Sequence, residues 1–202
     1  MGIILRRDHY LSWRDMEYQK AAPKPGHSLP ELDLLVDKAR NGNDSSFEKL
    51  WLHYQPKMLR YLSMFTRDAE DLCSEVWIRI AGSIKGFVGD SSAFQGWIFT
   101  IARNAATDHA RKEKRIGPKS ELRDNDWVKS DSSLLEITDL LKDLPEDQCE
   151  VITLRIIIGL EIDQVAEITG KSNSYVRVLS HRGLAQLNKD LIKSGYTRGG
   201  GA

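Results

Sequence analysis

Residues 163–182 have the residue types and spacing of a helix-turn-helix, which binds DNA by placing its second helix in the major groove. Ala166 is a small residue where the two helices would cross, and Gly170 follows four positions later in the turn. Val176 and Leu179 supply apolar anchors on the second helix. Four matched positions in one short window favour this motif over an ordinary helical hairpin, which is the plain alternative.

The second helix of this motif is basic. From Lys171 to Lys193 the sequence has five Lys or Arg side chains and one acidic side chain, Asp190. Charged runs are usually solvated helix faces, so the charge alone would be weak support. Combined with the motif, it predicts contacts to DNA phosphates and base edges. Ser172 or Ser174 would cap the helix.

Two stretches in the N-terminal half have opposite charge. Residues 66–76 contain four acidic side chains against Arg67, and residues 98–115 contain five basic side chains against two acidic ones. Acidic residues at the start of a helix and basic residues at its end also stabilise the helix dipole, and this simpler reading stays open for each stretch. Beside a DNA-reading unit, the two stretches together predict one protein-binding face and one nucleic-acid-binding face.

Helices must position these side chains, because apolar residues recur at helical spacing and no alternating run indicates a strand. We predict an all-α chain with two small helical domains, 31–115 and 134–193, joined by a flexible linker at 116–133. Residues 1–30 are read as an N-terminal extension and residues 194–202 as a flexible tail.

Three local features follow from the same pattern. Asn41-Gly42 ends the first helix, and Asp44 or Ser45 caps the next one. Pro56 is expected at or near a helix boundary. The apolar run Val151–Ile158 is rich in β-branched residues, but its helical flanks favour a buried helix over a strand.

Composition excludes several classes of protein. The 202 residues include 29 basic and 29 acidic side chains, so the net charge of zero excludes a uniformly basic nucleic-acid coat and an acidic disordered tail. No apolar run approaches the roughly 18 residues of a membrane span. The apolar run near the N-terminus is too short for the core of a signal peptide. Two cysteines make no disulfide framework, so a cytoplasmic protein without membrane insertion is expected.

An enzyme is a further class of function to consider. The five histidines are dispersed, and no metal-binding, phosphate-loop or nucleophile motif is present. We therefore expect no catalytic residue, no cofactor and no metal. Cleavage or modification of nucleic acid by the purified chain alone would favour the enzyme.

Four stretches, in order along the chain, resemble the extracytoplasmic-function sigma factors, the bacterial RNA polymerase initiation subunits of the sigma-70 family. They are residues 47–54, the acidic 68–80, residues 89–111 and residues 144–187. The resemblance implies a region 2 helical bundle and a region 4 helix-turn-helix. It also implies an alternative sigma factor that binds polymerase core and directs promoter recognition, melting and initiation.

The resemblance assigns expected roles to three sets of residues. The set expected to bind the polymerase core, at the coiled-coil of the largest subunit, is Asp68, Glu70, Asp71, Leu72, Glu75 and Val76. The set expected at the minus-ten DNA is Arg103, Asn104, Asp108, Arg111, Lys112 and Arg115. The set expected at the minus-35 DNA is Ser172, Ser174, Tyr175, Arg177, His181 and Arg182. The family also implies a contact of region 4 with the polymerase flap, and many members have an anti-sigma factor.

The recognition helix departs from the family pattern. Leu179 stands in place of a basic residue, Ser180 in place of an apolar one and Tyr175 in place of threonine. The minus-35 sequence cannot be inherited from relatives for this reason. A stand-alone helix-turn-helix regulator is the alternative function, although it would need neither the 68–80 stretch nor the 89–111 stretch.

Overall fold

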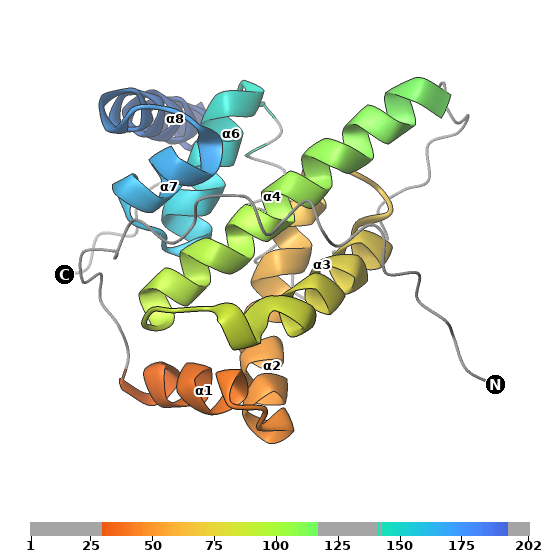
Figure 1. Ribbon diagram of the computed structural model, residues 1–202. Helices are drawn as coiled ribbons and strands as arrows, with labels where there is room; N and C mark the ends of the chain where they lie inside the picture. Colours follow the sequence, from red (N-terminus) through yellow and green to blue (C-terminus); the bar gives the residue numbers. More distant parts are fainter. Residues whose placement is uncertain (1–29, 117–140, 142, 194–202) are drawn as a thin grey trace.

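The computed structural model describes residues 30–116, 141 and 143–193 (Figure 1). Within these ranges the chain forms seven α-helices and no strand, which confirms the all-α prediction, and none of these helices is long and apolar enough to cross a membrane. The helices are α1 (Pro30–Arg40), α2 (Asp44–Leu62), α3 (Ala69–Ser83), α4 (Ser91–Ile116), α6 (Glu146–Ile152), α7 (Ile162–Thr169) and α8 (Asn173–Lys193). The predicted extension before residue 30, the linker beyond residue 116 and the tail from residue 194 lie outside the described residues.

An aromatic core holds α1 to α4 together. Tyr54 and Tyr61 of α2, and Phe94 and Phe99 of α4, are almost completely buried. The ring centroids of Tyr54 and Phe94 are 5.9 Å apart, and those of Tyr61 and Phe99 are 5.7 Å apart. Aromatic pairs at these separations stabilise a core beyond the area that they bury. They fix α4 against α2 and so decide which face of α4 is left outside the bundle.

Two local predictions for α2 are wrong. Its N-terminal cap is Asn43, whose side-chain oxygen accepts a hydrogen bond from the Ser46 backbone N–H at 2.8 Å, and neither Asp44 nor Ser45 has this role. Pro56 lies inside α2 and does not mark a boundary. Proline removes one backbone donor, but buried side chains before and after this exposed position keep the helix continuous.

The second half of the chain begins with α6, whose α-helical geometry changes to π-helical geometry at its C-terminal end. α6 passes directly into a π-helical turn, Thr153–Ile158, so the buried helix predicted for this stretch is confirmed, with a different geometry in its last six residues. Gly159 ends the turn at a φ of 87°, a left-handed conformation that glycine adopts without strain. The Arg155 side chain fixes the chain that follows the π-helical turn by donating a hydrogen bond to the Leu160 carbonyl at 3.0 Å.

The predicted helix-turn-helix is confirmed as α7 and α8. Gly170 ends α7 at a φ of 68°, and its N–H donates to the carbonyls of the last turn of α7. Ala166, Val176 and Leu179 are buried between the two helices, as their spacing indicates. The Ser172 hydroxyl accepts a hydrogen bond from the Tyr175 backbone N–H at 3.2 Å, so Ser172 caps α8.

Gly183 permits a close approach of α6 to α8. A Cβ atom at this position would lie 2.8 Å from Cγ1 and 3.2 Å from Cδ1 of Ile152. Real side chains do not pack so closely, so any larger residue would push the helices apart. The sequence pattern marks Gly183 only as a weak helix former and gives no sign of this contact.

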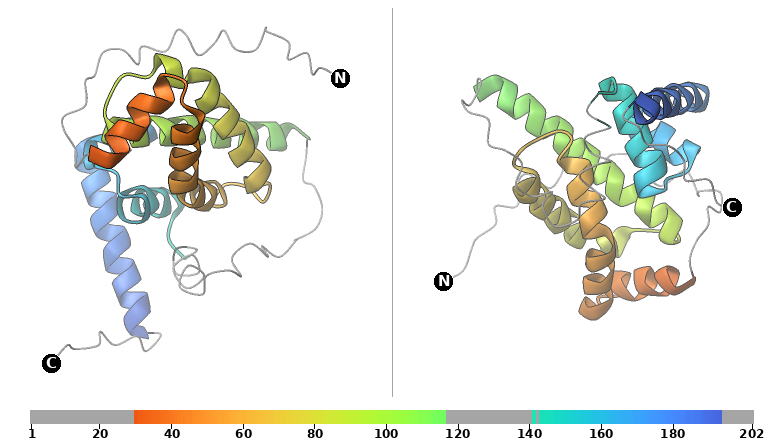
Figure 2. Two further views of the ribbon diagram at one scale, coloured as in Figure 1. Left: turned by 90° about the horizontal axis from the view of Figure 1, so that it is seen from below. Right: turned by 180° about the vertical axis from the view of Figure 1, so that it is seen from behind.

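The two halves pack into one body. Buried side chains of α1 to α4 and of the second half form a single hydrophobic cluster, in which α4 contacts α7 and α2 contacts the π-helical turn. Two further views show α6 and α7 beside α4, and the C-terminal part of α8 extending away from the body (Figure 2). In this structure the second half of the chain, from α6 to α8, contacts part of α4, which is one of the predicted DNA-binding elements.

We predict that Gly183→Ala lowers the free energy of unfolding. Overpacking against Ile152 costs about 1–3 kcal/mol, whereas the gain in helix propensity is at most about 1 kcal/mol. With a mid-range cost of about 2 kcal/mol, denaturant unfolding should show a net loss of about 1 kcal/mol. The matched control is Gly82→Ala in α3, where no atom lies within 4 Å of the added Cβ, and where stability should rise. A Gly183→Ala chain as stable as its parent would contradict the close contact.

Candidate nucleic-acid and protein interfaces

The acidic face of α3 is presented to solvent. Asp68, Glu70, Asp71 and Glu75 are all exposed, as the sequence predicts for a docking face. Glu75 lies 3.7 Å from the Arg79 guanidinium, an exposed pair that contributes little stability. Most of the negative charge of this face is therefore exposed to solvent.

Two apolar residues predicted for this face lie elsewhere. Leu72 and Val76 are 4% and 0% exposed and belong to the bundle core, so in this structure they are not available to a partner. Their helical spacing to other apolar positions favours the core over the surface. Ile78, which was not predicted, is 59% exposed and follows Glu75 by three residues on the same side of α3. An apolar residue at that spacing from the acidic residues was the signal that could have found it.

The basic end of α4 is only partly described. Arg111 and Lys112 are exposed, and Arg111 lies 3.6 Å from Asp108 in a surface pair. Asn104 is half-buried, and Arg115 is in α4 with its side chain outside the described part of the chain. The exposed cations lie near the C-terminal end of α4, beyond the stretch that the second half of the chain contacts.

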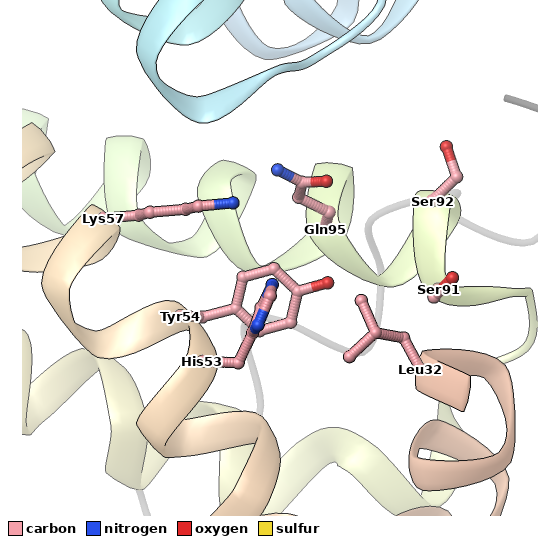
Figure 3. A pocket seen from close by; sticks show the side chains of 7 residues that line it. All are labelled: Leu32, His53, Tyr54, Lys57, Ser91, Ser92 and Gln95. Atoms are coloured by element: carbon pink, nitrogen blue, oxygen red, sulfur yellow. The ribbon is translucent and has the colours of Figure 1, made fainter. Parts of the chain in front are cut away.

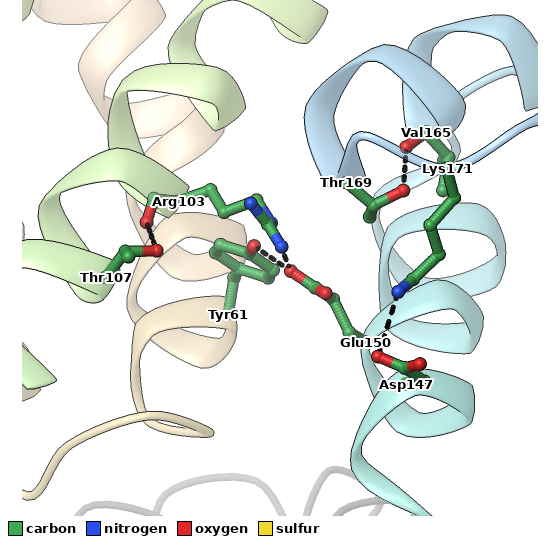
Figure 4. A network of polar contacts seen from close by, with 8 residues as sticks. All are labelled: Tyr61, Arg103, Thr107, Asp147, Glu150, Val165, Thr169 and Lys171. Carbon is green, nitrogen blue, oxygen red and sulfur yellow. Dashed lines mark hydrogen bonds and ion pairs between the residues drawn. The ribbon is translucent and has the colours of Figure 1, made fainter.

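Arg103, which was predicted at the minus-ten DNA, pairs within the chain in this structure. Its Nε donates a hydrogen bond to Glu150 Oε1 at 2.8 Å, and the Tyr61 hydroxyl donates to the same oxygen at 2.9 Å (Figure 4). The side chain of Glu150 is 7% exposed and that of Arg103 is 29% exposed. A buried carboxylate needs such partners because it has lost its water. The interaction joins α2, α4 and α6. In it, Arg103, a predicted DNA-binding residue, donates a hydrogen bond to Glu150.

The charges of this network are fixed by its neighbours. Burial, followed by the negative charge of Glu150, raises the pKa of the Tyr61 hydroxyl well above its ordinary value, so the group stays a donor. Burial alone would lower the pKa of Arg103, but the hydrogen bond and charge of Glu150 outweigh it, and the net pKa is raised. Both partners thus remain in the protonation state that the carboxylate needs.

The second half of the chain also contacts the start of α4. Gln95 Nε2 donates a hydrogen bond to the Ile158 carbonyl at 2.6 Å, and Gln164 Nε2 donates to the Ser92 carbonyl at 2.7 Å. With Arg103, these contacts lie along one side of α4, since the positions follow helical spacing.

A pocket of about 150 Å³ opens between α1, α2 and the start of α4. Burial lowers the pKa of Lys57, and burial followed by the charge of Lys57 lowers that of His53. The second half of the chain passes over the rim near Gln95 (Figure 3). The pocket combines aromatic, basic and hydroxyl groups, and its lining is Leu32, His53, Tyr54, Lys57, Ser91, Ser92 and Gln95.

One group of side chains has ligand atoms close enough to hold a metal ion among the described residues. Single ligand atoms of Asp68, His109 and Glu113 all lie within 4.8 Å of one another. His109 Nε2 is also 2.9 Å from Thr66 Oγ1, and both carboxylates are exposed. Exposed acidic groups commonly gather without a metal, so we read the group as a polar contact between the start of α3 and α4.

The predicted recognition helix is accessible. Tyr175, Arg177, His181 and Arg182 are exposed on α8, and Ser174 lies beside them. Val178, which was not predicted, is 41% exposed on the same stretch and adds an apolar contact surface.

The unusual serine in α8 has a structural consequence. Ser180 is half-buried, and its Oγ has no hydrogen-bond partner within the described ranges. An apolar side chain at this position would pack without such an unpaired polar group.

Two family models match the chain. Sigma-70 region 2 matches residues 50–116, and Sigma-70, region 4 matches residues 134–187. The first match covers most of α2 and all of α3 and α4, and the second covers α6, α7 and most of α8. The matches therefore fall on the two halves that the helices define.

Curated proteins and solved structures agree with these matches. The "ECF RNA polymerase sigma factor SigX" of Bacillus subtilis is 30% identical over 165 residues, which are 73% of this chain and 84% of SigX. The "ECF RNA polymerase sigma factor BldN" of Streptomyces coelicolor is 29% identical, and the match covers 76% of this chain and 63% of BldN. The sigma factor RpoE of Bartonella quintana, solved with the anti-sigma factor NepR, has a TM-score of 0.60 at 22% identity, over 73% of this chain and 96% of RpoE. At that identity the structure shows a shared fold.

We predict that Tyr61→Phe lowers the free energy of unfolding by about 1–2 kcal/mol. The variant keeps the ring in the core but leaves the buried Glu150 carboxylate with one hydrogen bond fewer, and bonds to charged groups are the stronger ones. Denaturant unfolding measures the change. Tyr175→Phe, at a 45% exposed tyrosine, is the matched control and should change stability by less than about 0.5 kcal/mol. Equal losses in both variants would show that the Tyr61 hydroxyl does not support Glu150.

Proposed function

Since the chain belongs to the extracytoplasmic-function sigma factors of the sigma-70 family, we propose which of its surfaces carries each part of that function. Such a factor is an alternative sigma factor: it binds RNA polymerase core and directs it to promoters for initiation. The observation that carries the assignment is charge segregation. Exposed acidic side chains gather on α3, while exposed basic side chains gather at the end of α4 and on α8.

The face of α3 is the proposed polymerase contact. Its four acidic side chains fit the basic coiled-coil of the largest polymerase subunit, and such complementarity steers association. Exposed ion pairs are individually weak, so the exposed Ile78 is proposed as the apolar centre of the contact. Leu72 and Val76 act from inside the core by holding α3 in place.

The outer face of α4 is the proposed minus-ten contact. Arg111 and Lys112 would hold phosphates, Asn104 and Asp108 would hydrogen-bond to bases, and Arg103 would join them once Glu150 releases it. The pocket at the start of α4 is the proposed site for an unstacked base, because an aromatic ring and polar edge groups are what a flipped base needs.

The exposed part of α8 is the proposed minus-35 contact. Arg177 and Arg182 can form bidentate hydrogen bonds with guanine, and Tyr175 and Val178 offer apolar contact to thymine methyl groups. Region 4 is also proposed to dock on the polymerase flap. As a sigma factor the protein supplies binding energy and no chemical step of its own, and its place beside polymerase is the cytoplasm.

An anti-sigma factor is a proposed further partner. RpoE of Bartonella quintana was solved with one, and it shares the fold of this chain. The partner would be a protein that covers the α3 or α4 face. Co-purification with the full chain, lost on addition of excess polymerase core, tests this proposal.

Run-off transcription tests the function as a whole. Purified chain and sigma-free core polymerase are given the promoter upstream of the protein's own gene and a fragment library. Start-specific transcripts that vanish when Asp68, Glu70, Asp71 and Glu75 are changed to Lys would support the assignment. Sequence-specific DNA binding by the chain without any transcript would favour a stand-alone regulator.

We predict that Ile78→Ala weakens binding to core polymerase about tenfold. The side chain is exposed in the free chain, so its truncation removes apolar area from the contact without opening a cavity. Competition against labelled wild-type chain measures the affinity. Ile156→Ala, at a 56% exposed isoleucine of the π-helical turn, is the matched control and should bind normally. Equal effects of the two variants would remove Ile78 from the interface.

We predict that Arg177→Ala and Arg182→Ala each weaken binding to a selected minus-35 duplex about tenfold or more, as expected for loss of a base contact. Fluorescence anisotropy at several salt concentrations separates two roles. A lost phosphate contact flattens the dependence of log K on log salt by about 0.9, whereas a lost base contact relaxes sequence preference. Lys189→Ala, beyond the motif on the same helix, should have a smaller effect. Normal binding by both arginine variants would exclude α8 as the reading helix.

A further inference from the structure

We propose that Tyr175 of α8 reads a thymine methyl group in the major groove, and that Asp147 of α6 positions its ring by way of Lys171. The inference rests on the proposed minus-35 role of α8 and deepens it. Tyr175 is the residue that touches DNA and sets specificity, while Lys171 and Asp147 are positioning residues behind it. Lys171 thereby leaves the set of cations that contact DNA phosphates.

The backbone of Lys171 is fixed by the turn between α7 and α8. Gly170 ends α7 in a left-handed conformation, and the Lys171 N–H donates a hydrogen bond to the Ala166 carbonyl at 3.0 Å. A helix end closed in this way holds the residue after the glycine in one place. The direction of the Lys171 side chain is then decided by the groups that its ammonium contacts.

Two groups contact the Lys171 ammonium, and they come from different helices. Lys171 Nζ lies 3.0 Å from Asp147 Oδ1 of α6 (Figure 4) and 5.8 Å from the centroid of the Tyr175 ring. The second distance is within the range of a cation–π contact. Because the carboxylate holds the cation in place, the cation in turn restrains the ring.

The burial of Lys171 argues against a phosphate contact. Its side chain is only 17% exposed, whereas Arg177 and Arg182 are exposed on the recognition helix. A lysine that neutralises a DNA phosphate keeps its charged head in water until the DNA arrives. Lys171 adds to the basic charge of this stretch in the sequence, but in the structure its charge is paired inside the protein.

Tyr175 lies where a recognition helix reads bases. It is in the first turn of α8, its backbone N–H donates to the Ser172 hydroxyl at 3.2 Å, and the residue is 45% exposed. Residues in this part of a recognition helix contact base edges. A ring that is held in one orientation before DNA binds avoids the entropy cost of ordering it in the complex. A tyrosine in place of the threonine of the family pattern therefore benefits from the cation beside it.

Deoxyuridine substitution tests the reading, because uracil lacks only the C5-methyl group of thymine. The full chain, alone and with polymerase core, selects its motif from a random duplex library, and each thymine of that motif is then replaced singly by deoxyuridine. One replacement should weaken wild-type binding about fourfold, as expected for the loss of one buried methyl group. Tyr175→Ala should bind the two duplexes equally. A motif without a uracil-sensitive thymine, or no enriched motif, would overturn the proposal.

Asp147→Asn and Lys171→Met test the positioning role. Both should lose the fourfold response to deoxyuridine at the same thymine, while the dependence of log K on log salt stays as in wild type. Lys171→Arg keeps a cation between the carboxylate and the ring and should retain the response. Glu146→Gln is the matched control, because it removes the same charge from an exposed side chain in the same turn of α6, and it should also retain the response.

Salt dependence separates this role from a phosphate contact. If Lys171 bound a phosphate, Lys171→Met would weaken binding to all duplexes alike and flatten the dependence of log K on log salt by about 0.9. Either that flattening or a retained deoxyuridine response in Asp147→Asn would overturn the proposal. An unchanged salt dependence also shows that the variants fold, since α8 then contacts phosphates as before.

Run-off transcription with wild-type chain and polymerase core separates the two levels. Start-specific transcripts, with the deoxyuridine response retained in Asp147→Asn and Lys171→Met, would leave the sigma function standing and remove the positioning role. Absence of transcripts, with the response lost in both variants, would remove the sigma assignment and keep the positioning role for a stand-alone regulator.

Discussion

A carboxylate taken out of water must be compensated, and Glu150 obtains its compensation from the other half of the chain. Arg103 and Tyr61 supply the two hydrogen bonds, so α6 cannot leave α2 and α4 without exposing or orphaning a charge. Apolar packing between the halves is non-directional and would tolerate sliding. The ion pair favours one register, and the amide contacts at the start of α4 fit the same register. The main effect of this network is therefore to select one arrangement of α6 against α2 and α4, and its contribution to net stability is smaller.

The helices and the motif were predictable from the sequence because their signals are local. Apolar spacing indicated the helices, and Ala166 with Gly170 indicated the turn between α7 and α8. The Pro56 boundary was wrong because tertiary packing on both sides outweighed one missing donor. The π-helical geometry after α6 has no spacing signature that distinguishes it from an ordinary buried helix.

The exposed residues of the site were predictable from the sequence, whereas the contacts between the two halves of the chain were less so. Acidic residues on α3 and basic residues on α8 lie where charge patterning puts them. The pairing of Arg103 was not predictable because its partner, Glu150, is 47 residues away along the chain, beyond any local pattern. Leu72 and Val76 were placed on the wrong side because a helix next to a docking face also needs a core face, whereas Ile78 shows which apolar position points outward.

The contact of Gly183 with Ile152 has a consequence for how this lineage can change over time. The two positions share one small volume, so their substitutions are not independent. A change at 183 to a residue with a Cβ costs less once residue 152 has become smaller, whereas the reverse order passes through an overpacked intermediate. Relatives that carry alanine at the position of Gly183, with the same helix separation, should therefore have a residue smaller than isoleucine opposite it.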